Sequence, residues 1–239
     1  DTSINASGSN VIYLAIAADG STATPSLANS FATEIYTGNG GAQSITGVGF
    51  KPDFTWIKNT TGYGHSQVLS NSVRPIGSFL ISNSTNAEVA STGLSSFDSD
   101  GFSMASGATN AIDETNFEFV SWNWKKSATA GLDIVGFTGN ETNRTVSHSL
   151  SAVPHYMVVR TRHGAAGRNY SVYHHKNTAA PQTDHIFWDS TQATEDDATI
   201  WNDTAPTSSV FSIGTNLGVN ENNKNIIAFL WTEKQGFSK

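Results

Sequence analysis

Short segments that alternate apolar and polar residues run through the whole chain, and a helical period is sustained nowhere. β-Branched and aromatic residues dominate residues 54–58 and 156–160, each bounded by proline and by glycine or charged residues. Residues 117–124 carry aromatic side chains on both faces, so we expect a strand that is central or covered on both sides. The best helical candidate, residues 194–200, is short and reads equally well as an Asp-rich turn. The pattern predicts an all-β fold.

The same pattern returns at a spacing of just over a hundred residues. Three segments align without gaps, each with one apolar residue, a polar stretch and an apolar strand: residues 4–16, 112–124 and 219–231. Shorter motifs match between them, namely residues 35–40 with 136–141, residues 49–59 with 151–161, and residues 101–107 with 210–216. A period this long exceeds that of a solenoid unit, so it predicts tandem domains.

The predicted architecture is two tandem β-sandwich domains, jelly-roll or lectin-like, because short strands recur with regular turn signals. We place repeat 1 at residues 30–126 and repeat 2 at residues 131–235. Residues 1–19 are predicted to be the last strand of a preceding repeat, and residues 236–239 the start of a link to a following one. Because the first residue is Asp1 and not Met, we expect the chain to be part of a longer, beaded array.

Composition narrows the function classes. The formal charge of −7 and the pI near 5.4 argue against a surface that binds nucleic acid, which needs clustered Lys and Arg. No apolar run reaches transmembrane length, so no membrane span is predicted. The chain has no cysteine, which excludes disulfides and thiolate metal sites.

Candidate metal ligands are few, and structural interpretations are favoured for them. Asp98 and Asp100 resemble the first residues of a calcium loop, but the distal Glu is missing and a β-turn ending in Gly101 explains them better. His174-His175, with His185 further on, lacks an HExxH spacing and any cysteine partner. We therefore predict no metal and no cofactor.

No catalytic motif stands out. The chain lacks a GxSxG elbow. Glycoside hydrolysis needs two carboxylates facing one sugar site, and no Asp or Glu lies in a motif that singles it out. We predict that the protein is not an enzyme.

The tryptophans divide into two groups. Those in the predicted strands are expected to fill the cores: Trp56, Trp122, Trp124 and Trp231. Trp188 and Trp201 lie among polar turn residues near Tyr173 and His174, and these four are candidates for contact with a glycan or a partner protein. The favoured alternative is that they pack against the neighbouring repeat or a sister chain.

Several motifs resemble a known repeat. YTGNG, GFKPDFTWIKN, SVRPIGSFLISNST, SFDSDGFSM and FVSWNW occur in this order, and the second copy follows with FTGNETNRTVSHSLSAVPHYMVVRTR and the terminal GFSK. Together they resemble a repeat domain of uncharacterised function that recurs in structural proteins of marine bacteriophages and cyanophages. The resemblance covers nearly all of the chain and implies a virion protein, assembled in the host cytoplasm, whose repeats follow one another in a tail fibre or other surface appendage.

Three functions follow from these observations. The first is a non-enzymatic virion structural protein whose partners are other virion proteins or sister copies of itself, as a homo-oligomer. The second is a receptor-binding module that recognises host-surface glycans and is compatible with the first. The third, a glycan-degrading enzyme, requires chemistry that the motifs do not contain.

Overall fold

The computed structural model describes residues 29–62, 64–163 and 167–234, and its first half is built from eight strands and one short helix. The elements are β1 (Phe31–Thr37), β2 (Gln43–Thr46), β3 (Phe54–Asn59), β4 (Val68–Asn71), β5 (Leu80–Ile81), β6 (Ser96–Asp98), β7 (Gly101–Met104), α1 (Asn110–Asp113) and β8 (Glu118–Trp124). A five-stranded sheet has the order β1-β8-β3-β4-β5, and a three-stranded sheet has the order β2-β7-β6. All of the paired strands are antiparallel.

The second half repeats this plan. Its elements are β9 (Leu132–Thr138), β10 (Arg144–Ser147), β11 (Tyr156–Thr161), β12 (Ser171–His174), β13 (Asp184–Phe187), β14 (Glu195–Asp196), α2 (Ala198–Trp201), β15 (Val210–Ile213), α3 (Leu217–Asn220) and β16 (Asn225–Trp231). A six-stranded sheet has the order β14-β13-β12-β11-β16-β9, and β10 pairs with β15. Read from the other end, β9-β16-β11-β12-β13 is the order of β1-β8-β3-β4-β5. The two halves are two copies of one topology.

Each half is a β-sandwich with its own core. In the first half the core between the two sheets includes Ile57, Phe102 and Phe119. In the second half it includes Val159 and Phe211. The fold is therefore all-β and of sandwich type, as the alternation predicts. The predicted segments 1–19 and 236–239 lie outside the described residues.

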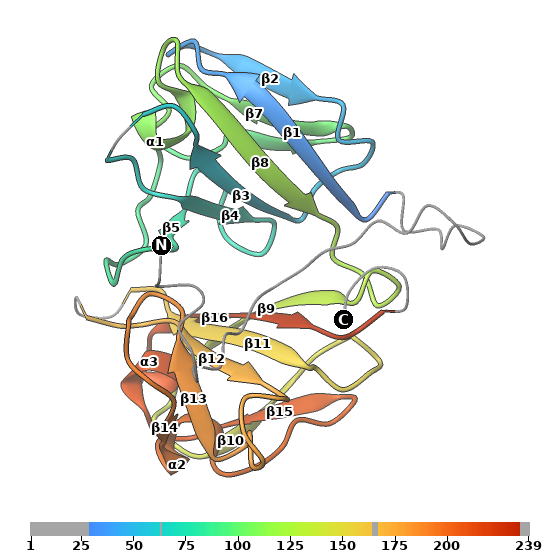
Figure 1. Cartoon of the computed structure of the whole chain (residues 1–239), viewed down its shortest axis with the longest axis vertical. Helices are drawn as coiled ribbons and strands as arrows, with labels where there is room; N and C mark the ends of the chain where they lie inside the picture. The colour runs from blue at the N-terminus through green and yellow to red at the C-terminus, as the bar shows by residue number, and fades with distance from the viewer. Residues whose placement is uncertain (1–28, 63, 164–166, 235–239) are drawn as a thin grey trace, which may run out of the picture.

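The two sandwiches share a core and so are not separate beads. A third core lies between the halves, where Phe54, Leu69 and Leu80 of the first pack with Val158 and Phe229 of the second. The five- and six-stranded sheets face each other across it, so the molecule has four layers (Figure 1). The physical reason is that both faces of each large sheet are apolar, and apolar surface is stabilised by removal from water. The strand predicted at residues 117–124 is β8, which lies between β1 and β3 and is covered on both sides, as predicted.

Polar contacts also join the halves at this seam. The Arg160 side chain of β11 donates to the main-chain carbonyls of Ser84, at 2.9 Å, and Asn86. The Tyr170 hydroxyl donates to the carbonyl of Ile81 at 2.9 Å, and the Arg160 guanidinium lies 4.3 Å from the centre of the Tyr170 ring. Burial raises the pKa of Tyr170 to about 12, although the charge of Arg160 lowers it, so its hydroxyl stays a donor.

A buried ion triad completes the seam. The Glu88 carboxylate of the first half accepts from Arg162 of the second half, from Nη2 at 2.6 Å and from Nε at 2.8 Å. The carboxylate also accepts from Arg74 Nη1 at 2.9 Å, and the more exposed His163 ring lies 3.3 Å from it. The Glu88 and Arg74 side chains are 2% and 0% exposed, so these charges depend on one another for solvation.

The helices are single turns. α1 and α3 occupy equivalent places before β8 and β16, and each begins at a capping side chain, Thr109 and Asn216. The predicted helical candidate at residues 194–200 divides into β14 and the start of α2. None of the helices in the described part of the chain is long and apolar enough to span a membrane.

Candidate ligand-binding groove

The second half covers the first half's large sheet only part of the way along its strands. At the covered end, Trp124 of β8 and Phe54 of β3 are neighbours and are buried. Two residues further along the same face, Trp122 and Trp56 lie opposite each other and are half-buried. After two more residues, Lys58 is exposed. An aromatic face therefore emerges from the central core into solvent.

Two adjoining pockets follow this edge and share Trp56 and Gln67, and together we name them the aromatic groove. The sheet pocket, of about 620 Å³, is also lined by Phe31, Thr33, Lys58, Trp122 and Trp124. The seam pocket, of about 600 Å³, is also lined by Ser82, Asn83, Trp188, Asp189, Ser190 and Thr191. These volumes lie within the range of small-molecule sites.

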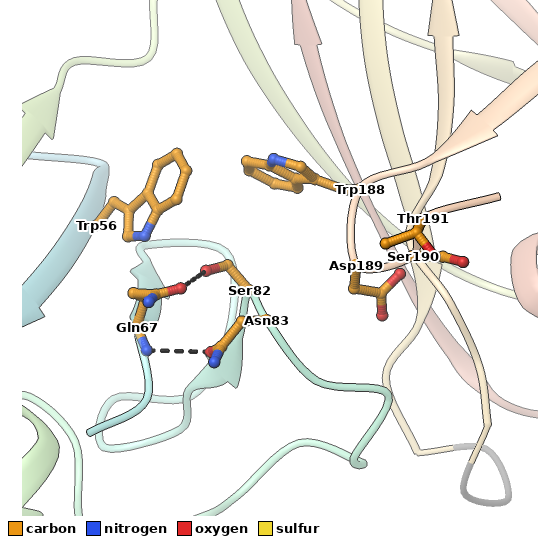
Figure 2. Close-up of a pocket in the computed structure, with 8 residues that line it drawn as sticks. All are labelled: Trp56, Gln67, Ser82, Asn83, Trp188, Asp189, Ser190 and Thr191. Atoms are coloured by element: carbon orange, nitrogen blue, oxygen red, sulfur yellow. Dashed lines mark hydrogen bonds between the residues drawn. The ribbon is translucent and has the colours of Figure 1, made fainter. Parts of the chain in front are cut away.

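Three indole rings run along the groove. Trp188, which follows β13, comes from the second half and meets Trp56 of the first with ring centroids 5.0 Å apart and planes at 82°. Trp56 meets Trp122 at 5.7 Å and 61°. Figure 2 shows Trp56 and Trp188 reaching toward each other from the two sides of the seam pocket. These edge-to-face contacts hold the rings in fixed orientations.

Polar groups lie beside the rings. The Ser82 hydroxyl donates to the Gln67 amide oxygen at 3.3 Å, and the Gln67 main-chain N–H donates to Asn83 Oδ1 at 3.2 Å (Figure 2). Trp56 Nε1 and Asp189 Oδ2 are buried and have no hydrogen-bond partner among the described residues. A buried polar atom without a partner costs about 1–3 kcal/mol, so a hydroxyl-bearing ligand that reached these two atoms would gain affinity from them.

The arrangement suits a ligand that has both apolar faces and many hydroxyls. Aromatic side chains offer large apolar surfaces, and a few fixed polar groups provide orientation and specificity. A sugar ring has this character, since its C–H faces pack on aromatic rings and its rim donates and accepts hydrogen bonds. Lys58 and Asp189 add one charge of each sign, Lys58 in the sheet pocket and Asp189 in the seam pocket.

The structure does not bring together the four residues predicted to contact a glycan or a partner. Trp201 and Tyr173 are 1% and 4% exposed and pack edge to face in the core of the second sandwich. Trp201 Nε1 donates to the Asp184 carbonyl, so this indole is satisfied internally. The prediction that Trp201 and Tyr173 are available to contact a glycan or a partner is wrong, because α2 turns Trp201 toward the core. Trp188 packs against the first half, and His174 lies beside Tyr156 with its Nδ1 accepting a main-chain N–H.

Of the groove's lining residues, sequence reasoning identified only Trp188, and it placed Trp56 and Trp122 in the core. Both were expected to fill a core, but both are half-buried. The alternation of their strands does predict that the two side chains share one face of the sheet. How far the opposite sheet covers that face depends on how the two halves meet, which local patterns do not contain.

Asp98 and Asp100 lie at the turn between β6 and β7, and their carboxylates stabilise it. Asp98 pairs with Gly101 at the end of the β6–β7 ladder, so Ser99 and Asp100 form the tip. Asp98 accepts from the Ser96 and Ser103 hydroxyls at 2.7 and 2.6 Å, and these hydrogen bonds, that of Ser103 first, lower its pKa. Asp100 accepts the main-chain N–H groups of Gly47 and Gly49. Both carboxylates are thus occupied by protein donors.

The structure gathers a different set of metal-ligand types. Among the described residues, His155, His175 and Glu233 place one ligand atom each within 4.8 Å of the others. His175 was noted in the sequence, but with His185 as its companion, and His185 is a buried residue packed edge to face on Phe187. His155 and Glu233 had no sequence signal of their own.

Comparison with known proteins identifies the family of the chain but does not indicate a function. None of the curated proteins compared with the chain matches it significantly. A family model described as a domain of unknown function, DUF7483, matches residues 26–239 and so spans both halves as one domain. The chain belongs to the DUF7483 family.

Proposed function

We propose that this chain is a non-enzymatic structural module of a bacteriophage virion that contacts host-surface glycans through the aromatic groove. The observation that carries the proposal is the line of three indole rings, Trp122, Trp56 and Trp188, held at a seam between two halves that are packed on each other. The virion part rests on the resemblance of the repeat motifs to structural proteins of marine phages.

Rigid presentation supports binding. Trp188 and Trp56 come from different halves, and the central core and the Glu88 triad fix the halves relative to each other. A site whose rings do not have to be ordered when the ligand arrives loses less entropy on binding. This favours a preformed glycan site over a surface that folds around its partner.

The acidic groups of the groove favour binding without hydrolysis. Asp189 is the one carboxylate among the described residues that line the two pockets. Its Oδ1 already accepts from the Tyr170 main-chain N–H and from the Asn169 amide, both at 3.1 Å. Hydrolysis of a glycosidic bond uses a pair of carboxyl groups about 5–10 Å apart.

Glycan binding is tested with an array of bacterial capsular and lipopolysaccharide oligosaccharides. The wild-type chain is expected to bind a subset, and Trp188→Ala and Trp122→Ala to weaken that binding at least about tenfold, the effect of about 1.4 kcal/mol. Trp231→Ala is the matched control, because Trp231 is half-buried at the same seam but does not line either pocket. Binding that all three variants retain equally would remove the groove from the proposal.

The virion assignment needs its own test. Antibodies raised against the chain are expected to label an appendage on purified particles of a phage whose genome encodes it, in electron micrographs of negatively stained particles. Labelling confined to lysed host material would contradict it. The proposed partners, sister copies of the chain or other virion proteins, are expected to sediment together with it from gently disrupted particles.

A further inference from the structure

The three residues His155, His175 and Glu233 lie at one end of the six-stranded sheet, away from the aromatic groove's lining. His155 directly precedes β11, His175 directly follows β12, and Glu233 lies two residues after β16. These three strands are neighbours in the order β12-β11-β16. Ladder hydrogen bonds continue past the strand ends, since the His155 N–H donates to the Trp231 carbonyl and the His175 N–H to the His155 carbonyl. The backbone therefore fixes all three positions.

We propose that His155, His175 and Glu233 form a binding site for a divalent transition-metal ion of the Zn²⁺ type. Two imidazoles and a carboxylate are a common ligand set for this class of ion. His175 Nε2 lies 3.2 Å from Glu233 Oε1, and the His155 and His175 rings are 4.4 Å apart at 31°. Bonds of about 2.0–2.1 Å in tetrahedral geometry place ligand atoms about 3.3 Å apart, so an ion needs only a small closure of this cluster.

The equivalent end of the five-stranded sheet in the first half has the same backbone arrangement with different side chains. We call this arrangement the corner, and the comparison shows which of its side chains the backbone needs. The Asp53 N–H donates to the Trp124 carbonyl and the Ser72 N–H to the Asp53 carbonyl, as at His155 and His175. There the Asp53 carboxylate accepts from the Ser72 hydroxyl at 2.7 Å and from the Lys126 N–H at 2.9 Å. Asp, Ser and Lys thus close this corner with hydrogen bonds alone.

The second half has a ligand type at all three of these positions, whereas the first half has one, the Asp53 carboxylate. His155 takes the place of Asp53 and still accepts a main-chain N–H, that of Glu233, on Nδ1 at 3.0 Å. His175 takes the place of Ser72, and Glu233 that of Lys126. The corner's backbone geometry does not require these side chains, because the first half forms it without them. A metal site would explain why two histidines and a glutamate lie together here.

The hydrogen bonds of the cluster change when an ion binds. Since His155 Nδ1 accepts a hydrogen bond, its neutral ring carries the proton on Nε2, and an ion must displace that proton or replace that hydrogen bond.

Lys176 is the group that an ion would displace. Its ammonium lies 3.3 Å from Glu233 Oε1 and is 63% exposed, so it can move into solvent. The His175 and Glu233 side chains are 23% and 34% exposed, which leaves an approach from solution. We therefore expect Lys176→Met to tighten metal binding, because the carboxylate then has no competing cation.

The experiment is calorimetric titration of ZnCl₂ into the tag-free chain at pH 7.5, with CaCl₂ as a control for hard cations. We expect one zinc ion per chain and little heat with calcium. The matched variant carries His155→Asp, His175→Ser and Glu233→Lys together, which transplants the first half's corner, and it should weaken zinc binding at least about a hundredfold. If this variant does not fold, His175→Ser alone serves, checked by circular dichroism.

Two results would overturn the proposal. One is the absence of zinc binding by the wild-type chain at millimolar metal. The other is binding that the folded variant retains in full, which would place the ion at another of the chain's seven histidines. Neither result bears on glycan binding, because none of these three residues lines the aromatic groove.

Discussion

The ion triad at the seam gives a quantitative test of how the two halves hold together. Glu88→Gln keeps the size of the side chain but removes the charge that Arg74 and Arg162 share. Three charge-assisted hydrogen bonds end on this carboxylate, at 2.6, 2.8 and 2.9 Å. Breaking a buried ion pair by removing one partner costs about 3–5 kcal/mol, because the remaining charge stays buried. The Gln amide keeps one acceptor oxygen, so we expect a loss near the lower end, about 3 kcal/mol.

The assay is thermal and urea unfolding of wild type and variant. For a chain of 239 residues, about 2–4 °C in Tm corresponds to 1 kcal/mol, so Glu88→Gln should lower Tm by about 6–12 °C. Glu221→Gln is the matched control, since its partner Arg168 forms a more exposed pair at 3.0 Å, and it should cost at most about 1 kcal/mol. A shift for Glu88→Gln no larger than that of the control would refute the idea that the triad locks the seam.

Three further predictions concern other properties of the buried residues. Burial alone would raise the pKa of Glu88, but hydrogen bonds and charge from Arg162 and Arg74 lower it below 4.5. The stability that the Glu88 carboxylate contributes is therefore complete above about pH 4.5 and is lost as pH falls through the lower pKa of the folded state. In urea unfolding, the difference in free energy of unfolding between wild type and Glu88→Gln should be smaller at pH 3 than at pH 7, and an equal difference at both would contradict this. Trp201→Ala should cost about 3–5 kcal/mol in urea unfolding, because Trp201 fills a core; a loss under about 1 kcal/mol would mean that the ring is not buried. Tyr170→Phe removes the hydrogen bond of 2.9 Å to a carbonyl of the first half and should lower stability by about 1–2 kcal/mol, measured in the same way, whereas an unchanged midpoint would place no hydrogen bond there.

The sequence predicted the all-β fold because strand alternation and turn residues act locally. The aromatic residues on both faces of residues 117–124 also indicated a strand covered on both sides, as β8 is. What covers the second face was not predicted. The same alternation is compatible with a sister chain, a neighbouring repeat or the other half of the same chain.

Sequence reasoning missed most of the candidate-site residues, because the groove depends on how the halves meet and the metal cluster depends on strand register within the second half. Lys58 and Arg160 occupy equivalent places in β3 and β11, yet Lys58 is exposed and Arg160 is 1% exposed with its guanidinium bonded to the other half. Trp56 lines a groove for the same reason. His155, His175 and Glu233 are far apart in the sequence and meet only because the register of three strands brings their ends together.

The most direct test of the groove follows the indole N–H signals of the six tryptophans by NMR during titration with a glycan that binds on the array, each signal assigned by a Trp→Phe substitution. We expect the signals of Trp56, Trp122 and Trp188 to shift together and saturate at one affinity. The Trp201 signal should stay in place, because this indole is buried and bonded to a carbonyl. Groove signals that do not move while the glycan binds would contradict the proposed site.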